Sequence, residues 1–284
     1  MSSTFKPVIK WAGGKKSLSK QLSQIILEQL DGFDRYVEPF FGGGGLFFSL
    51  NNDMFFKSSK KKIIINDINK DLMNLYKDIK RNPKKLISVH EKVKQQYHDH
   101  GFYYIRDRYN GSKGHPYKGI YKSAALMILN KTCYNGLYRV NKSGEFNVPV
   151  GRYSPPAFVK ANEVLLTSNI LPDLKNIHNK SYEKIEIRKN DLVYLDPPYD
   201  IENKNSFTSY AGEFKQNEQE KLHKYFEKIV KIGAKVILSN SNTKSMRDLY
   251  SSHKIKRISA PRGISPKSDR KAKELIILGN NFQN

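Results

Sequence analysis

The chain has 284 residues, of which 50 are Lys or Arg and 27 are Asp or Glu, so its formal charge at neutral pH is +23. This excess of positive charge points to a polyanionic partner such as nucleic acid, although a solvated, lysine-rich surface also accounts for it. The single cysteine, Cys133, excludes an intramolecular disulfide and a thiolate metal cluster and favours a reducing, cytoplasmic location. No apolar run reaches the ~18 residues of a membrane helix, so we expect neither a membrane segment nor a signal peptide.

Residues 7–15 form the first motif, a loop that precedes an amphipathic helix with apolar residues from Leu18 to Leu30 on one face. The segment 13–17, Gly-Gly-Lys-Lys-Ser, is similar to a phosphate-binding P-loop. However, position 9 is Ile where that motif has its earlier glycine, and no strand precedes the segment. We therefore reject a nucleoside-triphosphatase.

Two predicted strands follow. Residues 35–41 predict the first core strand, and the glycines at 42–45 turn the chain into a helix that begins near Leu46. Residues 62–67 predict the second strand, which ends in Asp67. This aspartate lies near the ~20-residue interval at which an acidic side chain accepts hydrogen bonds from ribose hydroxyls in doubly wound folds. Asp67 would also cap a helix predicted over 68–79, and the two roles are compatible.

From about residue 70 to 165 the pattern changes to helices and polar loops. We interpret 70–165 as an inserted, mainly helical domain, and residues 1–69 and 166–284 as the core domain. Inside the insertion, a predicted hairpin over 134–153 interleaves arginine, asparagine and aromatic residues. Arginine pairs bidentately with guanine, and asparagine with adenine, so the hairpin is a candidate DNA reader. The residues alone equally fit an ordinary polar hairpin.

The strand predicted over 192–195 runs directly into Asp196-Pro197-Pro198-Tyr199. Its β-branched and aromatic residues indicate a buried parallel strand, and the prolines end the ladder and fix the carbonyls of Asp196 and Pro197. Ligands bind at the carboxyl ends of such strands. A carboxylate, a carbonyl and the Tyr199 ring together suit a planar heterocycle with an exocyclic amine, such as adenine. By itself the tetrapeptide would be a capped turn, but the upstream glycine loop and Asp67 favour a ligand site.

The remaining chain predicts a helix over 216–231, a strand over 234–240 and a last strand over 274–278. Between them, residues 254–273 carry eight Lys or Arg against one acid and are interrupted by prolines and a glycine. We expect a mobile basic loop there that contacts phosphates.

Taken in this order, the motifs resemble those of the Dam/DpnII-type DNA adenine-N6 methyltransferases of the D12 class over nearly the whole chain. The matching segments are Lys10-Trp11-Ala12-Gly13-Gly14-Lys15, Glu38-Pro39-Phe40-Phe41-Gly42-Gly43-Gly44, Asn135-Gly136-Leu137-Tyr138-Arg139 and Asp196-Pro197-Pro198-Tyr199. The resemblance implies a doubly wound, Rossmann-like α/β sheet that binds S-adenosylmethionine, with 70–165 as a DNA-recognition domain. It also implies methyl transfer to N6 of adenine in double-stranded DNA without a metal. We expect a monomer.

The resemblance assigns roles to three sets of residues. The catalytic set is Asp196, Pro197, Pro198 and Tyr199. The cofactor-binding set is Trp11, Lys15, Glu38, Phe40, Gly42, Asp67, Tyr182 and Asp196. The DNA-binding set, which matches relatives that recognise GATC, is Lys10, Tyr134, Asn135, Leu137, Arg139, Pro149 and Tyr153, with Lys10 and Arg139 as readers of guanine. Family members usually carry an Asp-Phe pair before the catalytic strand, where this chain has Ser181-Tyr182.

The implied reaction requires the adenine to leave the base stack. Asp196 and the Pro197 carbonyl would accept the two amine hydrogens and aim the nitrogen lone pair, while Tyr199 stacks on the base. Two alternatives remain. An rRNA base-amine methyltransferase shares Asp-Pro-Pro-Tyr but lacks the inserted domain, and a non-catalytic DNA-binding protein would not need Asp67, the glycine loop and Asp196 together. The sequence leaves open whether the enzyme serves restriction-modification, a phage or regulation.

Overall fold

The computed structural model describes residues 4–11, 16–153, 155–199, 216–260, 272–279 and 282. The chain divides into two compact units, each built from separate stretches of sequence. Unit 1 comprises Met1–Gly14, Gly42–Asn52 and Asp67–Asn179, and unit 2 comprises Lys15–Phe41, Asp53–Asn66 and Lys180–Asn284. Neither unit is therefore a continuous segment of the chain.

Strands within the described ranges form one mixed sheet in the order β3-β2-β1-β4-β5-β7-β6. Their bounds are β1 Arg35–Glu38, β2 Lys62–Asn66, β3 Ile177–His178, β4 Asp191–Leu195, β5 Lys235–Ser241, β6 Lys254–Ala260 and β7 Ala272–Leu278. β1 is parallel to β2 and β4, and β4 is parallel to β5. β7 is antiparallel to both β5 and β6. The sheet confirms the predicted α/β fold class.

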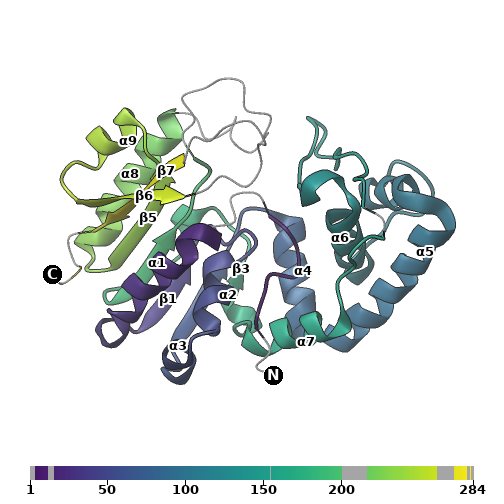
Figure 1. The fold of residues 1–284 in the computed structure, drawn as a ribbon, viewed down its shortest axis with the longest axis horizontal. Coiled ribbons are helices and arrows are strands. Elements are labelled where there is room, and N and C mark those ends of the chain that lie inside the picture. The colour runs from purple at the N-terminus through teal and green to yellow at the C-terminus, as the bar shows by residue number, and fades with distance from the viewer. Residues whose placement is uncertain are drawn as a thin grey trace. The chain divides into compact units, whose positions relative to one another are not determined.

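The central strands are buried along their whole length. Every residue of β1, β4 and β5 is buried, as expected for parallel strands whose two faces are both covered. Helix α8 (Gln216–Lys231) packs on this sheet through Leu222, Phe226 and Ile229, which join Val193 and Val236 in one hydrophobic cluster. The other helices of unit 2 are α1 Lys16–Leu27, α3 Met54–Ser58 and α9 Lys244–Leu249. Figure 1 shows α8 and α9 beside β5, β6 and β7.

Unit 1 is mainly helical, with α2 Gly45–Asn51, α4 Lys70–Arg81, α5 Pro83–Asn110, α6 Ile120–Thr132 and α7 Ala161–Ile170. Helix α6 is its core element, because its residues from Ser123 to Asn130 are all buried. It contacts both α4 and α5, and Figure 1 shows α5 and α6 side by side. Gly101 interrupts α5 with φ of 83°, a conformation that favours glycine, and kinks the helix there.

Two predictions of local structure were wrong. Residues 254–260 are not a loop but the strand β6, which pairs with β7 over its whole length. Its lysines and arginine lie on the outermost strand of the sheet, where charge discourages pairing with other chains. The last two residues of the predicted basic loop, 272 and 273, belong to the strand β7, and residues 261–271 lie outside the described residues. Helix α4 is capped by Asn69, whose Oδ1 accepts the Leu72 N–H at 2.9 Å, rather than by Asp67.

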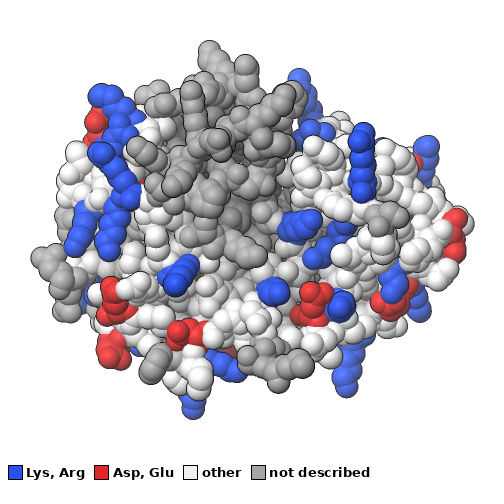
Figure 2. All heavy atoms as spheres, viewed as in Figure 1, with Lys and Arg blue, Asp and Glu red and all other residues white. Residues whose placement is uncertain are grey.

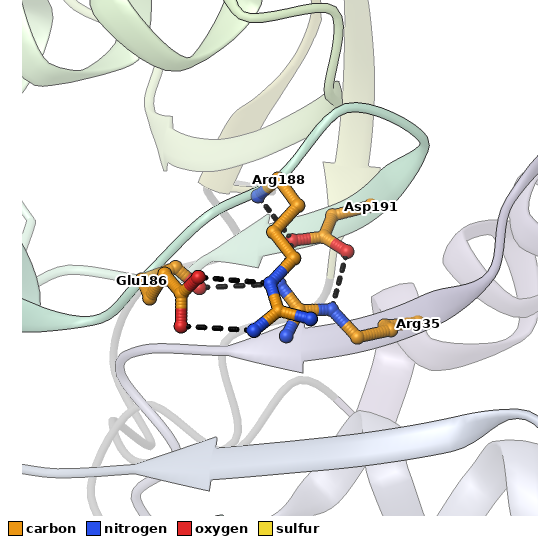
Figure 3. A network of polar contacts seen from close by, with 4 residues as sticks. All are labelled: Arg35, Glu186, Arg188 and Asp191. Carbon is orange, nitrogen blue, oxygen red and sulfur yellow. Dashed lines mark hydrogen bonds and ion pairs between the residues drawn. The ribbon is translucent and has the colours of Figure 1, made fainter.

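A buried ion pair joins the first residues of β1 and β4 (Figure 3). Arg35 donates from Nε to Asp191 Oδ1 at 2.7 Å and from Nη2 to Oδ2 at 2.5 Å. The backbone N–H of Arg188 donates to the same carboxylate at 2.7 Å, and Arg35 Nη2 also reaches the carbonyl of Glu186 at 3.2 Å. Three donors therefore satisfy a carboxylate that is almost inaccessible to water.

Two further features concern the distribution of charge on the surface and the length of the apolar helices. Lys and Arg side chains are spread widely over the face drawn in Figure 2. No helix in the described ranges is long and apolar enough to cross a membrane.

Candidate functional site

Asp196-Pro197-Pro198-Tyr199 leaves the sheet at the carboxyl end of β4, as predicted. Pro197 is buried, and Asp196, Pro198 and Tyr199 are half-buried. Two contacts from other elements hold the tetrapeptide. Gln219 of α8 donates from Nε2 to the Pro198 carbonyl at 3.3 Å, and Tyr199 Oη donates to Glu274 Oε2 of β7 at 2.8 Å.

Tyrosines of this corner are held in the neutral form. Burial, followed by the charge of Asp196, raises the pKa of the Tyr199 phenol far above its ordinary value. Burial and Asp196 likewise raise the pKa of Tyr194, whose hydroxyl lies 3.1 Å from Ser239 Oγ. Neutral phenols are hydrogen-bond donors, as Tyr199 is toward Glu274.

Other predicted cofactor residues of unit 2 lie at the carboxyl end of β1 or just after it, and in the segment that follows β3. The Glu38 side chain is 2% exposed and accepts a hydrogen bond from Tyr36 Oη at 3.0 Å. The rings of Phe40 and Tyr182 have centroids 4.9 Å apart, and Tyr182 also meets Tyr225 edge-on at 5.1 Å. Tyr182 is therefore largely enclosed by protein rings, and the adjacent Ser181 Oγ donates to Glu183 Oε2 at 3.5 Å.

In unit 1, Asp67 is fixed by the glycine loop. Its Oδ2 accepts the Gly42 N–H at 2.8 Å, and its Oδ1 accepts the Asn69 N–H at 2.9 Å. Burial nevertheless raises the pKa of the Asp67 carboxyl above its usual 3.8, against the lowering effect of these backbone donors. Ile68, immediately after it, is 66% exposed. A fixed acceptor beside an exposed apolar side chain offers both a polar and an apolar surface to a nucleoside.

Trp11 contacts both the glycine loop and the predicted hairpin over 134–153. A Cβ atom on Gly43 would be 2.9 Å from Trp11 Cβ, and one on Gly42 would be 3.0 Å from Trp11 Cδ1. On another side, the indole stacks on the Tyr138 ring with centroids 5.0 Å apart and planes inclined by 25°. Gly42 and Gly43 thus leave room for the tryptophan, a second reason for glycine at these positions beside the approach of a ligand. Lys15, the remaining predicted cofactor residue, lies outside the described residues.

The predicted hairpin is present as a loosely paired segment. Antiparallel bridges join Cys133 to Val150 and Val140 to Phe146, and the Tyr134 N–H donates to the Pro149 carbonyl at 2.9 Å. Asn135 has φ of 54°, a left-handed conformation that asparagine tolerates well. The predicted DNA-binding residues that are exposed are Lys10, Tyr134, Asn135, Pro149 and Tyr153, while Leu137 and Arg139 are half-buried.

Lys10 is joined to this hairpin by Asn130, a fully buried residue of α6. The Asn130 side chain accepts the Lys10 N–H at 2.7 Å and donates to the carbonyls of Lys10 and Gly136 at 2.8 and 3.0 Å. The Lys10 Nζ atom lies 5.0 Å from the centroid of the Tyr153 ring. The structure thus brings Lys10 to the predicted reading residues, which lie more than a hundred residues away in sequence.

Sequence reasoning missed the amide side chains that hold these groups. Buried Asn66 donates to the carbonyls of Pro39 and Lys180 and accepts the Lys180 N–H at 2.9 Å. Asn147 accepts from Arg139 Nε at 2.7 Å, and Asn179 donates to the carbonyls of Asp67 and Ile68 at 2.8 and 2.9 Å. The sequence did show an isoleucine directly after Asp67, but only the structure shows that its side chain is exposed.

In a comparison with known families, residues 11–264 match the family described as "D12 class N6 adenine-specific DNA methyltransferase". Among curated proteins, the chain is 37% identical to "Type II methyltransferase M.MjaIII" of Methanocaldococcus jannaschii, over 96% of this chain and 98% of that protein. It is 33% identical to "Type II methyltransferase M1.LlaDCHI" of Lactococcus lactis subsp. cremoris, over 98% and 96%. It is 30% identical to the "DNA adenine methylase" of Haemophilus influenzae, over 96% and 93%.

Proposed function

The chain belongs to the D12 class of N6 adenine-specific DNA methyltransferases, and we propose that it takes the methyl group from S-adenosylmethionine and modifies the adenine of GATC or of a longer site containing it. Transfer of a methyl group to adenine N6 in DNA is the activity of the class. We further propose that residues 70–165 are the DNA-recognition domain, that residues 1–69 with 166–284 are the catalytic domain, and that the protein acts as a monomer in the cytoplasm.

For S-adenosylmethionine, the supporting observation is the surroundings of Asp67. The carboxylate is held by the N–H groups of Gly42 and Asn69, so its lone pairs have a fixed direction. The ribose hydroxyls of a nucleoside would donate to it, and the exposed side chain of Ile68 would cover part of the adenine. We assign cofactor binding to Trp11, Lys15, Glu38, Phe40, Gly42, Asp67, Tyr182 and Asp196. When bound, S-adenosylmethionine supplies a methyl group on a sulfonium.

Positioning of the target amine falls to Asp196 and Pro197. The adenine amine is a weak nucleophile because its lone pair is delocalised into the ring. The Asp196 carboxylate and the Pro197 carbonyl each accept one amine hydrogen and so direct the lone pair. The prolines fix the geometry of these acceptors, and the Tyr199 ring stacks on the base after it has left the duplex.

For GATC, the single supporting observation is the cluster around Lys10. Asn130 joins the Lys10 backbone to Gly136, within the segment that matches GATC-reading relatives. Arg139 is oriented by Asn147 through Nε and Nη2, at 2.7 and 3.3 Å, so its Nη1–Nη2 edge suits guanine O6 and N7. Tyr134, Asn135, Leu137, Pro149 and Tyr153 complete the proposed contacts.

The test is to treat a random-sequence duplex library with the purified protein and labelled S-adenosylmethionine, and to sequence the methylated adenines. We expect a consensus containing GATC, and a consensus without it would refute the specificity. Asp196→Ala should lower the rate at least ~10²-fold while duplex binding persists, because loss of one positioned polar group costs about that much. Asp31→Ala, at an exposed position, is the matched control.

A further inference from the structure

Glu274 lies at the end of the sheet where the parallel strands terminate. It is opposite Ser241, the last residue of β5, and opposite Ile258 of β6. Because β7 runs antiparallel to β5, the beginning of β7 is at the same edge as the ends of β4 and β5. The half-buried carboxylate of Glu274 thereby reaches Tyr199, whose Oη donates to Glu274 Oε2 at 2.8 Å.

The direction of this hydrogen bond follows from the protonation of its partners. Burial keeps Tyr199 a neutral phenol, since it raises the pKa of the group far above its ordinary value. The phenol therefore donates and the carboxylate accepts, and such charge-assisted bonds are roughly twice as strong as neutral ones.

The ring of Tyr199 is thus held from both ends. At the backbone end, Gln219 donates to the Pro198 carbonyl, and Asn240 Nδ2 in turn donates to Gln219 Oε1 at 3.1 Å. Gln219 is 2% exposed and Asn240 is fully buried, so this end is rigidly packed. At the hydroxyl end, the hydrogen bond from Oη to Glu274 restrains rotation about the Cα–Cβ bond of Tyr199, because that rotation would carry the hydroxyl away from the carboxylate. Glu274 thereby fixes the direction in which the ring points.

We propose that Glu274 is a positioning residue for methyl transfer, whose carboxylate holds the Tyr199 ring at the angle at which a flipped adenine stacks on it. The inference rests on the proposed role of Asp196-Pro197-Pro198-Tyr199. Glu274 acts as an acceptor and takes no proton in the reaction. Glutamine, which retains one acceptor oxygen on a side chain of the same length, should therefore replace it in large part.

The experiment measures single-turnover methylation by the full chain with saturating S-adenosylmethionine and duplex DNA. Glu274→Ala should slow the transfer roughly 10-fold, the effect of losing one hydrogen bond to a charged group. Glu274→Gln should recover most of the rate. Neither should change the KM for S-adenosylmethionine. Glu220→Ala, the same change at an exposed position of α8, is the control and should match the wild type.

A double-mutant cycle separates positioning from general destabilisation. Tyr199→Phe removes the donor and should cause the same loss as Glu274→Ala, and the double variant should lose no more than either. When 2-aminopurine replaces the target adenine, the flipped base should be less constrained in both variants. A faster decay of its fluorescence anisotropy would show this. Additive losses, or a Glu274→Ala rate within roughly twofold of the wild type, would overturn the proposal.

One more variant distinguishes failure of this inference from failure of the proposed function. If Tyr199→Ala transfers methyl groups at the wild-type rate, the role given to the tetrapeptide is wrong, and the role of Glu274 falls with it. If Tyr199→Ala is impaired roughly 100-fold or more while Glu274→Ala is not impaired, only the role of Glu274 is wrong.

Discussion

The indole of Trp11 stacks on the phenol ring of Tyr138, with the ring centroids 5.0 Å apart. Trp11 belongs to the proposed cofactor-binding set, and Tyr138 lies between Leu137 and Arg139 of the proposed DNA-reading segment. One aromatic contact thus links residues assigned to the two ligands. Because the chain has a single tryptophan, its emission reports on the surroundings of Trp11, of which this stack is a part.

We predict that Tyr138→Ala weakens S-adenosylmethionine binding, although Tyr138 is not assigned to the cofactor. An aromatic pair contributes about 0.5–1.5 kcal/mol, so the loss should be roughly 2–10-fold. Titration calorimetry measures it, and the tryptophan emission of the variant should no longer respond to duplex DNA. Tyr138→Phe keeps the ring and should behave like the wild type. Equal losses in the two variants would contradict a role for stacking.

The Asp67 carboxyl should make cofactor affinity depend on pH. Its pKa is raised by burial, so it takes up a proton at a higher pH than an ordinary aspartate. The protonated group accepts hydrogen bonds poorly, so S-adenosylmethionine affinity should fall as the pH is lowered through that raised pKa. Calorimetry between about pH 4 and pH 8 measures this change. Asp67→Asn should bind weakly at every pH, and a wild-type affinity that is flat over the range would exclude the role.

Arg139 should set specificity at one base pair. Arg139→Ala should cost about 1–3 kcal/mol of discrimination against the wrong base while lowering total affinity less. Arg152→Ala removes the same charge from an exposed position of the same segment. It should lower the affinity for all sequences alike and leave the methylated consensus unchanged. An unchanged consensus for Arg139→Ala would remove its assignment as a guanine reader.

The Arg35–Asp191 ion pair should contribute to stability and not to chemistry, since it lies at the opposite ends of β1 and β4 from Glu38 and Asp196. Arg35→Met leaves a buried carboxylate without its cation, and should lower the free energy of unfolding by about 3–5 kcal/mol. Adding Asp191→Leu should recover most of that loss, because a buried pair and an apolar pair of similar volume are nearly equivalent. Urea denaturation of the wild type and these two variants provides the measurement.

The spacing of apolar residues and the positions of turn residues predicted the helices and strands whose signals are local in the sequence. The helix over 216–231 and the strands that end directly before Asp67 and Asp196 follow from apolar patterns closed by turn residues. The strand β6 was missed because its two lysines and its arginine outnumber its two isoleucines, which do not alternate, and because its pairing with β7 is not visible locally. The capping of α4 was assigned to Asp67 because Asn69, two residues later, offers the same chemistry.

The contacts that hold the candidate site could not be predicted, because they join residues far apart in the chain. Asn66 reaches Lys180, Asn130 reaches Lys10, and Glu274 reaches Tyr199. Amide and carboxylate side chains of this kind are common in any sequence. Only the topology of the sheet and the packing of α6 select these particular ones as partners.

The long separation between Arg35 and Asp191 also has a consequence for synthesis on the ribosome. The two residues are 156 positions apart, so β1 is made long before β4, its partner in the sheet. At ~5–20 residues per second, the interval is roughly 8–30 s. During that time Asp67–Asn179, which make up most of unit 1, are completed and free to fold. The edge of β1 that pairs with β4 stays unpaired during that time, although β2 is already available to its other edge, so chaperone depletion should harm this protein chiefly before β4 emerges.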